Sequence, residues 1–186
     1  MSPRPERARL FVALDLPRSA REALARWRTE ALRDVDGLRV LPPDALHVTL
    51  CFLGWRPVDE IEAIRGAWAA TLTEVTAPTL AFEEPVWLPA RRPRVVAVRL
   101  ADPSGGLERI QATVSAALSE GGWYAPEARP FLAHVTVARV AGRARVRPAQ
   151  LEPPAAAGFR GAAVTLYRSR LERAGARYEA LRSIGL

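Results

Sequence analysis

Cysteine, histidine and long apolar runs are scarce in this sequence of 186 residues, and lysine is absent. The single cysteine, Cys51, excludes a disulfide within the chain and agrees with a reducing compartment. Residues 1–7 are polar, unlike a signal peptide, and no stretch approaches the roughly 18 apolar residues of a membrane span. We therefore expect a cytoplasmic protein with no membrane partner.

Because lysine is absent, all 27 basic residues are arginines, and with 20 acidic residues they give a net charge of +7. A basic balance of this size favours a polyanionic partner such as nucleic acid. However, an all-arginine set in a chain rich in alanine, glycine and proline is also typical of GC-rich coding. The local placement of the arginines is therefore more informative than their number.

Alternating and helical patterns divide the chain into strands and helices. Strands are expected at 9–16, 38–41, 46–53, 79–88, 94–100, 131–140, 162–171 and 177–184, and helices at 18–32 and 58–75. A third helix is expected to have its apolar face at 107, 110, 114 and 118 and to end at Gly121-Gly122. Asp102 and Pro103 are expected to supply the N-cap and first turn of the third helix. Residues 141–158, rich in proline, alanine and arginine, indicate a long loop.

The pattern of the first half returns in the second half. Three pairs of landmarks lie 85, 86 and 87 residues apart: Arg9 and Arg94, Pro17 and Pro103, and His47 and His134. Nearly constant offsets indicate an internal duplication of a strand-helix-strand unit, with approximate repeats at 9–88 and 94–171. We predict one domain over residues 1–186, built from two lobes.

The two histidines of the chain stand in matching tetrapeptides, His47-Val48-Thr49-Leu50 and His134-Val135-Thr136-Val137. In a strand, side chains alternate between faces, so each copy presents an imidazole and a hydroxyl on one face and two apolar side chains on the other. The same alternation places Cys51 on the face of His47, where a Cys-His nucleophile is conceivable, although a small buried filler is the simpler interpretation.

A lone histidine in such a strand usually satisfies a local hydrogen bond, but two matching copies favour a shared site. One imidazole can act as general base and the other as general acid in an in-line displacement at phosphorus, while Thr49 and Thr136 bind the phosphate oxygens. The symmetry of the motifs leaves open which histidine is the acid. No carboxylate stands at ligand spacing, so the sequence predicts no metal site.

These motifs resemble the two-histidine phosphoesterases, and within them the bacterial and archaeal RNA 2′,3′-cyclic phosphodiesterases, also described as 2′-5′ RNA ligases. The segments that carry the resemblance are Leu10–Pro17, His47–Gly54, Arg94–Val96, Arg129–Arg139 and Ala176–Leu181. The resemblance covers nearly the whole chain. It implies an α+β, bilobal fold in which two pseudo-symmetric lobes with antiparallel sheets flank a central cleft and the helices lie outside.

The resemblance also implies an activity and the residues for it. The enzyme would hydrolyse RNA 2′,3′-cyclic phosphate ends to 2′-phosphomonoesters, with ligation as the reverse type of reaction and without metal or cofactor. His47 would be the general acid and His134 the general base, and Thr49, Thr136 and Arg139 would bind the phosphate. Strict alternation from His134 places Arg139 on the opposite face, so its role requires a bulge or twist in the strand.

Further residues are candidates for contact with the RNA body. Two arginine-rich segments, 91–94 and 143–147, with arginines at 91, 92, 94, 143, 145 and 147, are candidates to follow an RNA backbone, and Trp123 or Tyr124 is a candidate for stacking on a base. Each arginine can equally belong to a solvated face, and each aromatic ring to the core. The expected partner is an RNA with a cyclic phosphate end, such as a tRNA half, bound by a monomer.

Two alternatives remain open at this stage. The first is a phosphodiesterase that acts on a small cyclic nucleotide or on ADP-ribose cyclic phosphate, which a substrate panel would distinguish. The second is an RNA-binding module without turnover, which the retention of both histidines and both threonines disfavours.

Overall fold

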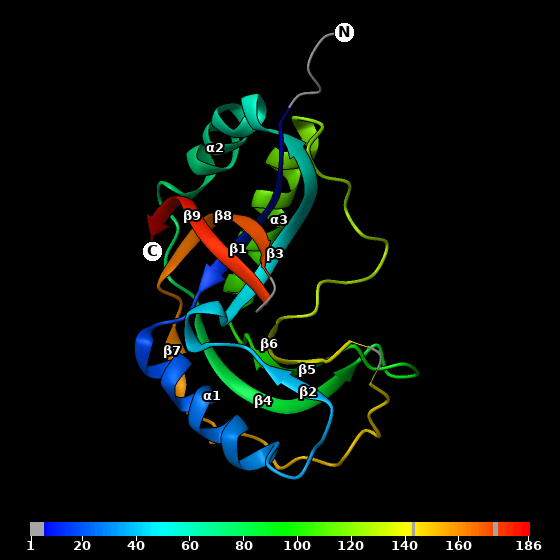
Figure 1. Ribbon diagram of the computed structural model, residues 1–186. Coiled ribbons are helices and arrows are strands. Elements are labelled where there is room, and N and C mark those ends of the chain that lie inside the picture. The colour runs from blue at the N-terminus through cyan, green and yellow to red at the C-terminus, as the bar shows by residue number, and fades with distance from the viewer. Residues whose placement is uncertain (1–5, 143, 173–174) are drawn as a thin grey trace, which may run out of the picture.

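Nine strands form two sheets in the computed structural model, which describes residues 6–142, 144–172 and 175–186 (Figure 1). The first sheet has the order β3-β1-β8-β9, with bounds His47–Pro57, Arg7–Asp15, Ala163–Glu172 and Gly175–Gly185. The second has the order β2-β6-β5-β4-β7, with bounds Leu38–Val40, His134–Val140, Val95–Ala101, Thr79–Leu88 and Gly158–Arg160. Every pairing is antiparallel. The predicted α+β class with two antiparallel sheets is therefore confirmed.

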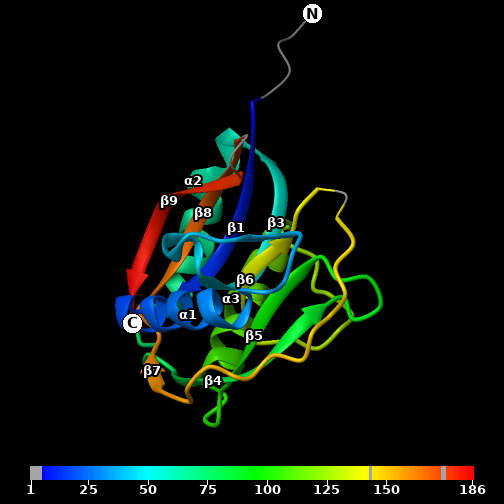
Figure 2. The same ribbon diagram turned by 60° about the horizontal axis from the view of Figure 1, so that its bottom comes forward.

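The helices lie beside these sheets. They are α1 (Arg18–Ala31), α2 (Ile61–Ala69) and α3 (Gly106–Glu120), with single 3-10 turns η1 (Pro43–Ala45), η2 (Val58–Glu60) and η3 (Ala70–Leu72). Helix α3 contacts β3 and α2, whereas α1 contacts β6 of the second sheet. Figures 1 and 2 accordingly place α2 and α3 beside the first sheet and α1 beside the second.

The two sheets exchange strands along the chain. β4, from the first half of the sequence, pairs with β5, and β8, from the second half, pairs with β1. Each sheet thus combines strands from both approximate repeats instead of forming from one repeat alone. The strands β3 and β6, which carry the histidine motifs, belong to different sheets and contact each other. The internal duplication itself stays a prediction.

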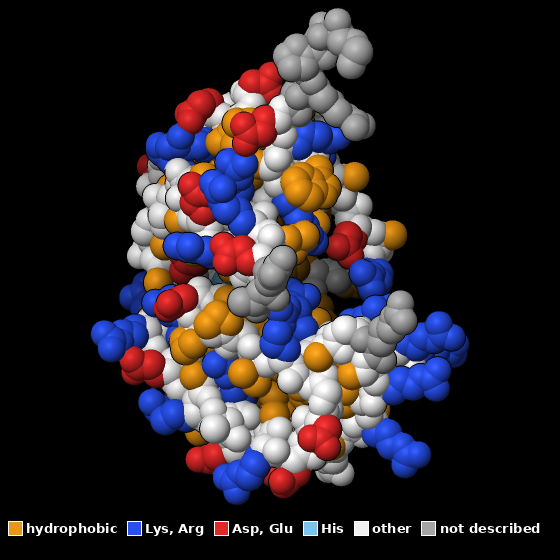
Figure 3. All heavy atoms as spheres, viewed as in Figure 1, with side chains coloured by type: hydrophobic (Ala, Val, Ile, Leu, Met, Phe, Trp, Pro, Cys, Tyr) orange, Lys and Arg blue, Asp and Glu red, His pale blue; other side chains and the backbone are white. Residues whose placement is uncertain are grey.

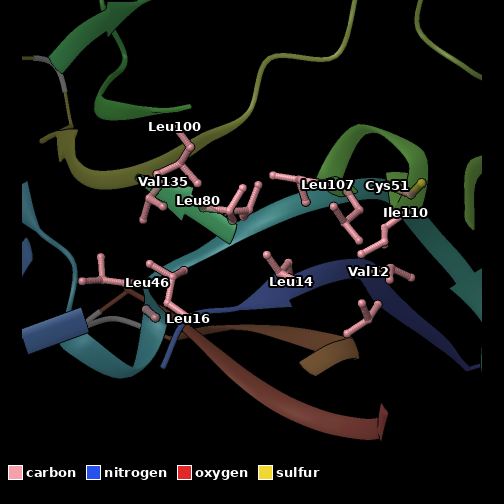
Figure 4. Packing of buried hydrophobic residues seen from close by; sticks show 14 of the residues in the cluster. Val12, Leu14, Leu16, Leu46, Cys51, Leu80, Leu100, Leu107, Ile110 and Val135 are labelled. Atoms are coloured by element: carbon pink, nitrogen blue, oxygen red, sulfur yellow. The ribbon is translucent and has the colours of Figure 1, made fainter. Parts of the chain in front are cut away.

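One apolar core joins the two sheets and α3. Strand β1 is apolar at consecutive positions because both of its faces are covered, and Val12 and Leu14 are completely buried. Figure 4 shows these side chains in the same cluster as Leu107 and Ile110 of α3. Burying each large aliphatic side chain contributes about 1.5–3 kcal/mol, so this core holds β1 and β3 firmly in place. Trp68, predicted as core, is also fully buried.

Two local predictions are wrong. The helix expected at 58–75 is regular α-helix only at 61–69, with a 3-10 turn at each end. Asp102 and Pro103 precede the third helix, and the N-cap is Gly105, whose φ of +64° suits glycine. The side chain of Asp102 still caps the N-terminus of α3, because its carboxylate accepts hydrogen bonds from the backbone N–H groups of Gly106 and Glu108 at 2.9 and 3.1 Å.

Candidate active site

Strands β3 and β6 each begin at a histidine and each carry a bulge three residues later. In the pairing of β3 with β1, Cys51 and Thr49 face consecutive residues, so Leu50 is left without a partner. In the pairing of β6 with β5, Val137 is skipped in the same way. A bulge reverses the alternation of side chains beyond it. The bulges therefore turn the residue five positions after each histidine, Phe52 and Arg139, to the face of the histidines.

The bulge in β3 overturns the placement of Cys51. Its side chain is only 1% exposed and lies in the core next to Ile110, as Figure 4 shows, instead of sharing the face of His47. Burial raises the pKa of its thiol to about 12. A neutral thiol in the core cannot serve as the nucleophile of a Cys-His pair, and Cys51 acts as the small buried filler.

The bulge in β6 brings Arg139 to the site. Arg139 lines a hollow of about 330 Å³ together with His47 and Thr49. Thr49 also lines a second hollow of about 1030 Å³, in which His134 takes part. Thr49 therefore lies where the two hollows meet. Thr136 is partly buried, two residues after His134 in β6, and lines neither hollow.

His47 is enclosed by aromatic rings from distant strands. Its imidazole stacks on Phe11 with ring centroids 5.0 Å apart and meets the ring of Tyr178 edge-on at 5.3 Å. The pKa of His47 is lowered to about 4, mainly by burial and to a smaller extent by the charge of Arg139 and the neighbouring His134, while a hydrogen bond to the backbone of Ala45 opposes the shift. At neutral pH and without a bound anion, His47 is therefore uncharged.

His134 is oriented by its own strand. Its Nδ1 lies 2.7 Å from the carbonyl oxygen of Leu132. Because a carbonyl oxygen can only accept, Nδ1 carries a proton and donates it, so the neutral imidazole has its free lone pair on Nε2. An imidazole in this tautomer is ready to take a proton at Nε2.

A partly buried carboxylate supports the aromatic rings around His47. Asp15 accepts hydrogen bonds from the hydroxyls of Thr165 and Tyr167 at 2.6 and 2.7 Å, and the ring of Tyr167 stacks on Phe11. Burial raises the pKa of Asp15, and these two hydrogen bonds oppose that shift. The network fixes Phe11, and through it the ring of His47.

Sequence reasoning missed the aromatic neighbours of His47. Phe11, Tyr167 and Tyr178 come from three different strands, and no spacing in the sequence links them to His47. Phe52, 46% exposed, lines both hollows and is covered on its ring by the guanidinium of Arg9 at 4.7 Å. One signal was available for Phe52, because it follows His47 by the same five residues that separate Arg139 from His134.

The arginines proposed for RNA contact lie where β4 and β5 of the second sheet are joined by a turn. Those at 91, 92, 94, 145 and 147 are exposed, and Arg143 lies outside the described residues. The two segments are neighbours because the N–H of Val140 bonds the carbonyl of Arg94 and the indole of Trp87 bonds the carbonyl of Ala149. Figure 3 shows basic side chains gathered over the turn between β4 and β5.

The two candidate stacking rings have different surroundings. Trp123 and Tyr124 both pack against the core, and Tyr124 also lines the larger hollow. In the described part of the chain, no group of three or more His, Cys, Asp or Glu side chains is placed to hold a metal ion. No helix of the described residues is long and apolar enough to cross a membrane.

Comparison with known proteins adds to this geometry. A curated RNA 2′,3′-cyclic phosphodiesterase of Escherichia coli K12 is 31% identical over 182 residues, covering 95% of this chain and 96% of the relative. One of Thermus thermophilus is 32% identical over 189 residues, with 96% and 90% covered.

Solved structures from the same two organisms also resemble this chain. The crystal structure of E. coli LigT complexed with ATP matches with a TM-score of 0.76 and 27% identity, over 97% of this chain and 99% of that one. TT0787 of T. thermophilus matches with a TM-score of 0.79 and 28% identity, over 96% and 97%. The sequence model of the 2′-5′ RNA ligase superfamily matches residues 16–173. With this match over most of its length, the chain belongs to the 2′-5′ RNA ligase superfamily.

Proposed function

We propose that this protein is an enzyme that hydrolyses RNA 2′,3′-cyclic phosphate ends to 2′-phosphomonoesters. The names of the curated relatives support this substrate and reaction. The observation that carries the proposal is that two contacting strands, β3 and β6, each begin with a histidine, and that the two histidines line adjoining hollows. Two imidazoles on either side of one phosphate are suited to acid-base catalysis of an in-line displacement.

His134 acts as the general base and His47 as the general acid. Nε2 of His134 takes a proton from water as the water oxygen bonds to phosphorus. The bond from phosphorus to the 3′ oxygen then breaks, and His47 donates a proton to that oxygen. The carbonyl of Leu132 supports the first role, because it holds His134 in the tautomer with a free Nε2. The ribose then keeps a phosphate on its 2′ oxygen.

Thr49, Thr136 and Arg139 bind the non-bridging phosphate oxygens. The hydroxyls of Thr49 and Thr136 donate hydrogen bonds, and the guanidinium of Arg139 adds a charge-assisted one. The bulge that brings Arg139 into the hollow of His47 and Thr49 supports this role. A hydrogen bond to a charged group contributes about 1.5–3 kcal/mol.

The low pKa of His47 makes its protonation depend on the substrate. Before substrate binds, burial and the charge of Arg139 keep His47 neutral. A phosphate anion between the two side chains offsets the charge of Arg139 and favours the imidazolium. We therefore expect His47 to gain the proton that it later donates when the cyclic phosphate binds.

The test is to incubate the purified protein with a short RNA ending in a 2′,3′-cyclic phosphate, with chelator present, and to identify the product end by phosphorus NMR. A 2′-phosphate is expected. His47→Ala and His134→Ala should each lower the rate by about 10²–10⁴-fold, the usual worth of general acid or base catalysis, with unchanged circular dichroism spectra. An unchanged cyclic end with the wild-type protein would contradict the proposal.

The alternative substrates are a small cyclic nucleotide and ADP-ribose cyclic phosphate. Exposed arginines at the turn between β4 and β5 and in the neighbouring segment give a basic surface that a longer RNA can follow, which favours RNA. A higher kcat/KM for an oligonucleotide than for the matching cyclic mononucleotide, with the gain lost at high salt, would support RNA. Equal values at all salt concentrations would favour a small nucleotide.

The same proposal extends to the source of the RNA, the assembly and the compartment. Cyclic phosphate ends of tRNA halves or other small RNAs are suitable substrates. A monomer is supported because one chain supplies both histidines and both threonines. A cytoplasmic location is supported by the single, buried cysteine. Sedimentation of the purified protein tests the monomer directly.

A further inference from the structure

Trp55 is the most exposed of the five tryptophans, and its side chain is 54% exposed. Trp68 is fully buried, and Trp123 packs against the core. The indoles of Trp27 and Trp87 donate hydrogen bonds to backbone carbonyls. Those four rings stabilise the fold, whereas Trp55 leaves a large apolar ring in water. Because the hydrophobic effect disfavours such exposure, Trp55 is a candidate for contact with a ligand.

A second bulge in β3 places Trp55 on the face of the active site. In the pairing with β1, Phe52 and Gly54 face consecutive residues, so Leu53 is left without a partner. This bulge reverses the alternation of side chains, so Trp55 shares the face of Phe52 although three positions separate them. Trp55 lies opposite Arg9, and Figure 1 shows this end of β3 beside the start of β1.

Two arginines of β1 accompany these rings. The guanidinium of Arg9 lies 4.7 Å from the ring centroid of Phe52, and Arg9 also lines the hollow of about 330 Å³ that contains His47. Arg7 is exposed, and its guanidinium donates a hydrogen bond to the backbone carbonyl of Trp55 at 2.6 Å. Aromatic rings for bases, with guanidinium groups between them for phosphates, are the elements that bind single-stranded RNA.

The direction of attack places the substrate on this side. In an in-line displacement, the attacking water and the leaving oxygen lie on opposite sides of phosphorus. His134 is the proposed base and His47 the proposed acid, so the 3′ oxygen and the ribose that carries it lie toward His47. The hollow of His47, about 330 Å³, is at the lower end of the range for ligand pockets and has room for about one nucleoside. The preceding nucleotide therefore lies beyond the rim of that hollow.

The RNA can leave the hollow on two sides. One side, formed by Arg9, leads along β1 and β3 to Trp55. The other side leads to an adjoining hollow of about 430 Å³, where Arg177 is accompanied by the carboxylates of Asp44 and Glu172. Because these carboxylates repel a phosphodiester, the side of Arg9 attracts the RNA more strongly.

We propose that the end of β3 and the start of β1 form a subsite for the nucleotide that precedes the cyclic phosphate end. Its base stacks on Trp55, and the phosphate that joins it to the terminal nucleoside binds the guanidinium of Arg9. Arg7 binds the next phosphate. This inference rests on the proposed function and adds to it the path of the RNA. Trp55 follows the segment His47–Gly54 that resembles the two-histidine phosphoesterases, so the subsite is not part of that resemblance.

The test compares adenosine 2′,3′-cyclic phosphate with the dinucleotide ApA that ends in the same cyclic phosphate. The two substrates share the reaction and the terminal nucleoside, so the ratio of their kcat/KM values measures the contribution of the preceding nucleotide. The variants are Trp55→Ala, Trp55→Phe and Arg9→Gln. Arg177→Gln, which changes an exposed arginine of the adjoining hollow, is the matched control.

We expect the wild type to prefer the dinucleotide. Trp55→Ala should lower the ratio by about 5–100-fold, as expected for the loss of one base stacked on an aromatic ring, and Trp55→Phe should lower it less because a ring remains. Arg9→Gln should lower the ratio by about 10–100-fold and make it less sensitive to salt. Arg177→Gln should leave it unchanged. Circular dichroism checks that each variant is folded.

Tryptophan fluorescence gives a reading that does not depend on turnover. The dinucleotide product with a 2′-phosphate should quench the fluorescence of the wild type more than that of Trp55→Phe. Equal quenching, a ratio unchanged in Trp55→Ala or a ratio lowered only in Arg177→Gln would overturn the inference and leave the proposed function intact. Equal losses for both substrates in Trp55→Ala, or equal kcat/KM values in the wild type, would overturn it too. Absent hydrolysis of both substrates would instead refute the proposed function.

Discussion

The low pKa of His47 predicts that acid destabilises this protein at one identifiable residue. His47 titrates near pH 4 in the folded protein and near 6.5 when unfolded. Between these values the unfolded state binds more protons, so stability falls as the pH falls. A difference of about 2.5 pKa units corresponds to about 3 kcal/mol lost from pH 7 to pH 4, at 1.36 kcal/mol per unit. That is a large share of the 5–15 kcal/mol typical of a folded protein.

The assay is urea unfolding of the wild type and of His47→Gln at a series of pH values from 7 to 4. Glutamine does not titrate, so the difference in unfolding free energy between the two proteins isolates His47 from the carboxylates. Asp15 would otherwise obscure the effect, because its raised pKa makes the folded state bind protons more readily and opposes the trend. The wild type should lose about 3 kcal/mol relative to the variant.

NMR gives a direct reading of the same quantity. The chain has only two histidines, so the imidazole signals are two, and His134→Gln assigns the remaining one. The signal of His47 should titrate near pH 4, and inorganic phosphate should move its midpoint upward by offsetting Arg139. A midpoint at or above 6.5 in the empty protein, or a pH-independent difference between wild type and His47→Gln, would refute the argument from burial.

Three further predictions concern single side chains. Arg139→Gln should raise the pKa of His47 toward 6.5, as measured by NMR. It should also lower kcat/KM about 10–100-fold, because the charge-assisted hydrogen bond to the phosphate is lost. An unchanged pKa of His47 would contradict the effect of the Arg139 charge. Cys51→Ala should keep the rate of hydrolysis within twofold of wild type and lower the free energy of unfolding in urea by about 1 kcal/mol, because it leaves a small cavity. A folded but inactive variant would make the thiol a candidate nucleophile again. Asp102→Ala should cost about 0.5–2 kcal/mol as a lost helix cap, with Ser104→Ala as the milder control.

The elements of the fold could be predicted from the sequence because apolar periodicity survives in single segments. The strand 79–88 has the predicted bounds, and the helix predicted at 18–32 ends one residue earlier. The pairing of strands could not be predicted in this way. The sheet that β4 or β8 joins depends on contacts between segments far apart in the chain, and periodicity carries no information on them.

The residues of the candidate site also fall into those that the sequence could place and those that it could not. The sequence predicts His47, Thr49 and His134 from the repeated motif, and the structure places these three along the two adjoining hollows. Alternation misplaces Cys51 and Arg139 for one reason, since each lies beyond a bulge that shifts its strand by one residue. A bulge leaves no mark in the hydrophobic pattern unless the apolar positions double, as they do at Leu50 and Cys51.

The exchange of strands between the sheets also bears on motion. Along the chain, the path changes sheet at four connections: β1 to β2, β2 to β3, β3 to β4, and β7 to β8. A hinge between two lobes usually bends at one or two connections. Here four segments would have to bend together, against a core shared by both sheets. We therefore expect the two adjoining hollows to keep their width through turnover, so that RNA ends enter and leave between walls that do not close.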